Sequence, residues 1–129
     1  MSLAVVLRYP SGFGFELALY PVDRIEIGVQ LASWLFVSEA SAYVRWVVLQ
    51  DGPHGLNVGL RAHAIASLFG GDDEHPSAVP GLLSVEGGYE HRVGSSLFGA
   101  EVGTVAFDGS WFPSDGLEIT AELRFGHLW

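Results

Sequence analysis

The chain has 129 residues, of which 49% are hydrophobic and 16% charged, with a formal net charge of −9 and no cysteine. This length fits one domain, residues 1–129, and the missing cysteines exclude disulfides, a thiol nucleophile and a thiolate metal site. All six basic residues are arginine. The acidic balance argues against nucleic-acid binding, because no basic stripe is available to meet phosphates.

The mean hydropathy of +0.32 is high for a chain of this size. No apolar run approaches the roughly 18–20 residues of a membrane helix. Two classes remain: a compact soluble β-protein, or a membrane β-barrel whose apolar signal is spread over short segments. Met1 leads directly into a strand-like segment without a signal peptide. We therefore expect either a cytosolic protein or, preferably, a mature exported chain with an added start methionine.

Eight segments alternate between apolar and polar residues with a period of two, which is typical of β-strands with one apolar face. Turn-forming Pro, Gly, Asp and Ser residues separate them. A break at Ser38, Glu39 and Ala40 is predicted to precede the fourth segment. The predicted strands are residues 2–9, 13–20, 25–36, 42–50, 56–69, 82–91, 97–107 and 117–129.

The last predicted strand, LEITAELRFGHLW, is the most regular one. Its odd positions are mainly apolar and its even positions carry the charges. A tilted strand crosses a bilayer with about 9–11 residues, so this segment is long enough to span one.

Charged residues inside the predicted strands lie on the face opposite the aliphatic row. If that row faces lipid, they form a polar network enclosed by the barrel. The predicted interior network consists of Arg8, Glu16, Glu26, Arg45, Arg61, Glu86, Glu90, Glu101, Glu118, Glu122 and Arg124.

The longer predicted connections, residues 70–81 and 108–116, are the fifth and the seventh. In an up-and-down array both lie at one end, while the second, fourth and sixth connections, all short, lie at the other. Short turns at one rim and longer loops at the other are typical of outer-membrane barrels.

Alternation alone does not say which face meets water, and a soluble barrel would bury the aliphatic row. Three features favour the reverse. The polar face lacks lysine and is rich in Gly, Ala and Ser; its Arg and Glu residues are suited to pairing in a confined space; and the strands exceed the usual 5–6 residues. An arginine at the bilayer midplane on the lipid side costs about 2–4 kcal/mol, so arginines are expected inside.

The terminal strand, with Leu123, Phe125 and Trp129 at alternate positions, resembles the end signature of bacterial outer-membrane β-barrels. Residues 15–34 and 88–107 resemble the strand–turn–strand units of small OmpA-like and OmpW-like barrels. The resemblance implies an all-β, eight-stranded antiparallel up-and-down transmembrane β-barrel in a bacterial outer membrane. It further implies a monomer surrounded by membrane lipid, lipopolysaccharide or detergent, without a cofactor. His127 departs from the apolar residue usual at its position.

The expected function is structural, or interaction through the surface loops. One alternative is a soluble calycin-like barrel that binds a small apolar ligand. The other is a lipid-A-modifying enzyme, which needs a serine beside a histidine oriented by a carboxylate. His63 with Ser67, and His91 with Ser95 or Ser96, are the nearest pairs. Neither has a convincing third member, so no catalytic residue is predicted.

The interior of an eight-stranded barrel is just wide enough to be filled by side chains, so we expect a polar plug. A narrow cation-preferring pathway is the alternative. The acidic loop at residues 72–75 could hold a divalent cation but lacks the ligand spacing of a calcium loop, so no metal ligand is predicted. Trp111 and Phe112 could seat at the headgroups or cover the barrel mouth.

Overall fold

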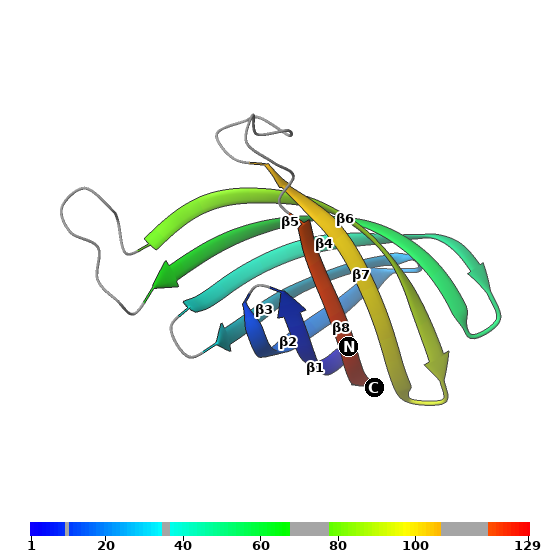
Figure 1. Ribbon diagram of the computed structural model, residues 1–129. Helices are drawn as coiled ribbons and strands as arrows, with labels where there is room; N and C mark the ends of the chain where they lie inside the picture. The colour runs from blue at the N-terminus through cyan, green and yellow to red at the C-terminus, as the bar shows by residue number, and fades with distance from the viewer. Residues whose placement is uncertain (10, 35–36, 68–77, 107–118) are drawn as a thin grey trace.

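The computed structural model describes residues 1–9, 11–34, 37–67, 78–106 and 119–129. Their eight strands form one closed antiparallel barrel in which each strand pairs with the next and the last pairs with the first (Figure 1). Among these residues no helix is long and apolar enough to cross a membrane. The strands are β1 (Ser2–Tyr9), β2 (Gly12–Val22), β3 (Ile25–Trp34), β4 (Val37–Asp51), β5 (His54–Ser67), β6 (Ala78–Val93), β7 (Ser96–Ala106) and β8 (Ile119–Leu128).

The pairing of β1 with β8 closes the barrel. Its register runs from Ser2 opposite Leu128 to Tyr9 opposite Ala121. The Trp129 amide then donates a 2.9 Å hydrogen bond to the Met1 carbonyl, so the two termini lie side by side. Closure leaves no strand edge exposed, and every strand has a hydrogen-bonded neighbour on both sides.

Three two-residue turns lie at the same end of the barrel as the termini. They join β2 to β3, β4 to β5, and β6 to β7. Arg24, Gly52 and Gly94 in these turns have φ of 71°, 57° and 59°, the left-handed conformation that tight hairpins require. These are the second, fourth and sixth connections, which the sequence predicts to be short.

The predicted break at Ser38, Glu39 and Ala40 is wrong, because all three residues belong to β4. They continue the antiparallel ladder with β3, Glu39 pairing with Ala32. Serine is common in turns, but cross-strand hydrogen bonding to β3 decides the conformation of these residues. Strand β6 likewise begins at residue 78 rather than 82 and passes a bulge opposite His63 and Ala64.

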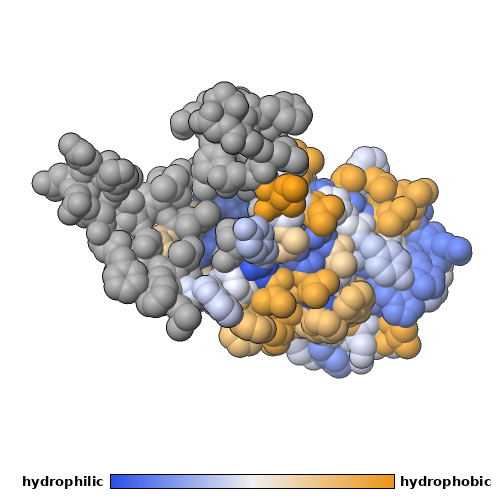
Figure 2. Space-filling model, viewed as in Figure 1, coloured by the Kyte–Doolittle hydropathy of each residue, from blue (hydrophilic) through white to orange (hydrophobic). Residues whose placement is uncertain are grey.

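The two faces of the wall differ sharply in chemistry. Ile27, Val29 and Leu123 are 46%, 55% and 41% exposed, whereas Glu122 is 3% exposed. Figure 2 shows hydrophobic residues spread over the near wall of the barrel. The aliphatic rows therefore face outward and the charged residues face the interior.

Candidate functional site

The interior of the barrel is the most distinctive site of the molecule. Ten of the eleven predicted network residues have buried side chains there, and the eleventh, Glu118, lies outside the described residues. Glu39 and His63 join them from β4 and β5. The buried charged residues are Arg8, Glu16, Glu26, Glu39, Arg45, Arg61, Glu86, Glu90, Glu101, Glu122 and Arg124.

All eight strands contribute to this cluster because their inward positions recur every second residue. Seven carboxylates face four guanidinium groups, and each guanidinium contacts more than one carboxylate. Burial of charges is costly unless they are paired, and each of these residues has an oppositely charged partner, although single atoms such as Glu16 Oε2 and Glu26 Oε2 have no hydrogen bond.

Arg8 and Arg61 organise one part of the network. The Arg8 guanidinium lies 2.7 Å from Glu86, 2.9 Å from Glu122 and 3.3 Å from Glu39. Arg61 contacts the same Glu86 at 2.9 Å and the same Glu122 at 3.3 Å. The two arginines thus share two carboxylates and tie β1 and β5 to β6 and β8.

Arg45 and Arg124 organise another part. Arg124 Nη1 donates to Glu16 at 2.9 Å and to Glu26 at 2.7 Å. Arg45 also donates to Glu26, and its Nε lies 2.6 Å from Glu101. Glu26 is therefore held by two arginines from β4 and β8.

Tyr43 packs in the centre of these charges. Its ring lies 4.4 Å from the Arg45 guanidinium carbon and 4.8 Å from that of Arg61. Its hydroxyl donates a 2.7 Å hydrogen bond to Glu26. Gly28, its register partner on β3, leaves room for the ring, because a Cβ there would lie 2.3 Å from the Tyr43 hydroxyl oxygen. The ring fills the interior while keeping both cations in contact with its face.

One buried chain of contacts has the residue types of a hydrolase triad. His63 Nδ1 donates to Glu39 at 2.5 Å, and His63 Nε2 lies 2.7 Å from the Ser84 hydroxyl. Ser84 also donates to Glu86 at 3.0 Å, and Ser84 is fully buried. The Ser84 hydroxyl therefore contacts the Glu86 carboxylate as well as His63. It has no exposed surface that a substrate could reach.

The two Ser–His pairs considered from the sequence do not form such a chain among the described residues. The Ser67 side chain lies outside the described part of the structure, and His91 contacts His54 across the β5–β6 pair. Ser84 shares the inward face of β6 with Glu86, which the period of two does predict. Its closeness to His63 depends on the β5–β6 register, which no local sequence signal contains.

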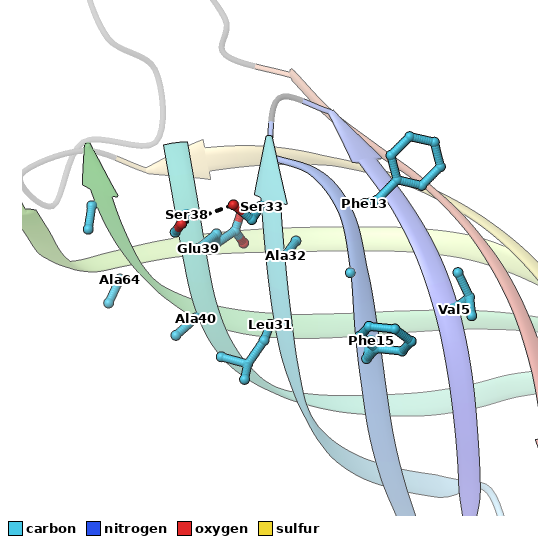
Figure 3. Close-up of a pocket in the computed structure, with 12 residues that line it drawn as sticks. Val5, Phe13, Phe15, Leu31, Ala32, Ser33, Ser38, Glu39, Ala40 and Ala64 are labelled. Atoms are coloured by element: carbon cyan, nitrogen blue, oxygen red, sulfur yellow. Dashed lines mark hydrogen bonds between the residues drawn. The ribbon is translucent and has the colours of Figure 1, made fainter. Parts of the chain in front are cut away.

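Hollows also lie over the outer wall and at the short-turn end of the barrel. A groove of about 540 Å³ runs over the outer wall of β1 to β5, where Leu31 and Phe15 lie to one side of the small residues Ala40 and Ala64 (Figure 3). A hollow of about 320 Å³ lies at the short-turn end and is lined in part by Arg92. Most of the lining of the outer groove is apolar, and Ser33, Ser38 and Glu39 form its polar part.

Within the described residues, no group of three or more His, Asp or Glu side chains is placed to hold a metal ion. The acidic loop at residues 72–75 and the aromatic pair Trp111 and Phe112 lie outside those residues. The structure defines a class: a closed eight-stranded barrel with an apolar wall and a charged interior. Comparisons with protein-family models, curated proteins and solved structures found no match to this chain.

Proposed function

We propose that this protein is a transmembrane β-barrel of a bacterial outer membrane, with a structural or surface-interaction role and a polar, plugged interior. The observation that carries the proposal is the inverted distribution of residues across the wall. At least 28 large hydrophobic side chains are exposed, while eleven charged side chains are buried. A soluble protein normally has the opposite arrangement.

The extent of the exposed apolar surface supports a lipid environment. Soluble monomers rarely expose contiguous apolar patches above a few hundred Å². Here every strand presents outward apolar residues, from Leu3 and Leu7 on β1 to Leu123 and Phe125 on β8. Such a belt is unfavourable in water and favourable against acyl chains.

Strand length and closure support the same environment. The strands run from 8 to 16 residues, and a tilted strand spans a bilayer with about 9–11. Backbone groups in hydrocarbon must be satisfied within the protein, which a closed barrel does. The short turns and both termini would then face the periplasm, and the remaining connections would face outward.

The orientation of the wall weighs against a soluble calycin-like barrel. That alternative needs the aliphatic rows to line a cavity for an apolar ligand. In this structure the interior is occupied by four guanidinium groups and their carboxylates.

The interior network favours a plug over a cation pathway. Each of the four buried arginines contacts carboxylates from different strands. The arginine side chains therefore cross the space that an ion would need. The proposed role is therefore carried by the outer connections and the membrane-facing wall rather than by conduction.

A second candidate function is hydrolysis of an acyl ester of lipid A, which the contacts among Glu39, His63 and Ser84 favour. Burial of the Ser84 hydroxyl and its bond to Glu86 weigh against it. Ser84→Ala decides between the two roles. Acyl release from lipid A that disappears in this variant assigns catalysis, and no release by the parent protein leaves the residues as part of the plug.

The membrane proposal is tested by producing the chain without detergent and then refolding it in micelles or vesicles. We expect insoluble material that refolds only with amphiphile and then migrates differently on gels with and without boiling. A monodisperse β-protein in plain buffer would overturn the proposal. Single-channel recording on the refolded barrel then tests the plug, for which we expect no steady conductance.

A further inference from the structure

A second polar cluster lies on the outer face of the barrel, near the short-turn end. His54 opens β5, and His91 is its register partner on β6. Tyr89 lies two residues before His91 on the same face of β6. These side chains are outside the interior network, since their neighbours Gly55 and Glu90 are the inward, buried residues.

Backbone pairing brings the two histidines close. The Arg92 amide donates to the Pro53 carbonyl at 2.7 Å, which makes that pair hydrogen-bonded and the next pair, His54 and His91, non-hydrogen-bonded. Side chains are closest at non-hydrogen-bonded pairs. The imidazole centroids are 4.6 Å apart, and the two Nδ1 atoms are 3.2 Å apart.

His54 Nδ1 has two neighbours in this exposed cluster. The Tyr89 hydroxyl lies 2.5 Å from His54 Nδ1, the same atom that His91 Nδ1 approaches. A neutral imidazole nitrogen has either one hydrogen or one lone pair, so His54 Nδ1 can satisfy only one of the two neighbours. A cation bound by both Nδ1 lone pairs would satisfy the two histidines together.

The spacing suits a transition-metal ion. Two imidazole nitrogens that bind one Zn²⁺ at about 2.0–2.1 Å with tetrahedral geometry lie roughly 3.3–3.4 Å apart. The observed 3.2 Å between the Nδ1 atoms is close to this value. The Tyr89 oxygen at 2.5 Å is too near His54 Nδ1 for both to bind one ion, so Tyr89 is not a ligand, and its hydroxyl gives up the contact with Nδ1 when the ion binds.

We infer that His54 and His91 form a binding site for a divalent transition-metal ion such as Zn²⁺ or Cu²⁺, with water completing the coordination. Imidazole ligands select these ions over Mg²⁺ and Ca²⁺, which prefer oxygen. Asp51, the register partner of His54 on β4, and the net charge of −9 favour a cation at this rim. The inference is independent of the proposed membrane location.

The bound ion would link two hairpins. His54 belongs to the β4–β5 hairpin and His91 to the β6–β7 hairpin, and the direct connection between β5 and β6 lies at the opposite end of the barrel. Binding to the folded state alone stabilises it by mass action, so an ion at a hundred times its dissociation constant favours folding about a hundredfold.

Calorimetric titration of the folded barrel with ZnCl₂ and CuCl₂ in chelator-treated buffer tests the site. We expect one ion per chain, tighter binding of Cu²⁺ than of Zn²⁺, and no response to Mg²⁺ or Ca²⁺. His54→Gln and His91→Gln should each weaken binding at least tenfold. Tyr89→Phe should retain it.

Two matched controls locate the ion. His127→Gln removes another exposed histidine, and His75→Gln removes the histidine of the acidic loop; both should bind as the parent does. Equal binding by His54→Gln and the parent, or loss of binding in either control, would overturn the assignment. Zn²⁺ should also raise the thermal unfolding temperature of the parent, and EDTA should reverse this rise; His91→Gln should show no rise.

Discussion

Glu26 and Arg124, which are 98 residues apart in the chain, are joined inside the barrel by a 2.7 Å contact. Glu26 lies on β3 and Arg124 on β8, and β1 and β2 separate these strands in the wall. The contact therefore crosses the interior rather than following the sheet. It links parts of the wall that no ladder hydrogen bond connects.

Replacing Arg124 with methionine should destabilise the barrel strongly. The side chain is 1% exposed, and its loss leaves Glu16 and Glu26 short of a buried partner. Breaking a buried ion pair typically costs about 3–5 kcal/mol. Arg92→Met is the matched control, because Arg92 pairs with Glu90 at the rim with 28% of its side chain exposed. The free energy of unfolding in urea is measured for both variants. Equal losses for Arg124→Met and Arg92→Met would contradict the prediction that the buried arginine contributes more.

Replacing Gly28 with alanine should destabilise the protein by about 1–3 kcal/mol through overpacking. The added Cβ would lie 2.3 Å from the Tyr43 hydroxyl oxygen and 2.4 Å from its ring. Gly87→Ala is the control, because a Cβ at Gly87 meets only one atom, a carbonyl oxygen at 3.8 Å. Urea unfolding of the two variants should separate them, and an unchanged midpoint for Gly28→Ala would be inconsistent with the packing of Tyr43.

Two substitutions at Tyr43 should separate its hydrogen bond from its ring. Tyr43→Phe removes the 2.7 Å bond to Glu26 and should cost about 1.5–3 kcal/mol, as for other hydrogen bonds to charged groups. Tyr43→Leu also removes the contacts of the ring with Arg45 and Arg61 and should cost more. Equal unfolding free energies for the two variants would show that the ring contacts contribute nothing.

A charge on the outer wall tests the membrane proposal at defined depth. Val29 and Val93 are similarly exposed, at 55% and 60%, but Val29 lies midway along β3 and Val93 ends β6. In a bilayer Val29→Arg should cost about 2–4 kcal/mol and Val93→Arg about 0–1 kcal/mol. The measurement is reversible unfolding from phospholipid vesicles. Similar small effects at both positions would mean that the wall faces water.

Much of the fold is predictable from alternation alone. The period of two marks all eight strands and places residues such as Glu16 and Glu101 on the face opposite the aliphatic row; the structure shows that this face is the interior. Strand ends are less predictable. The residues from Ser38 to Ala40 have a composition typical of a turn, yet they lie in β4 because β3 offers them ladder partners.

The contacts of the interior network are not predictable from the sequence. The sequence predicts a turn at Glu39, but this residue faces inward and contacts Arg8 and His63. No local sequence pattern predicts that Ser84 lies beside His63, and none predicts that His54 lies beside His91. Each of these contacts joins residues that are tens of positions apart in the chain. Their closeness depends on the register between strands.

By itself the sequence determined the number of strands, the identity of each face and the enrichment of arginine and glutamate on one of them, because side-chain direction in a strand follows local parity. Only the tertiary structure decided which carboxylate meets which guanidinium, how Tyr43 packs over Gly28, and that two histidines meet at the rim. These relationships arise from closure, since joining β8 to β1 sets the inward residues of all eight strands around one narrow interior.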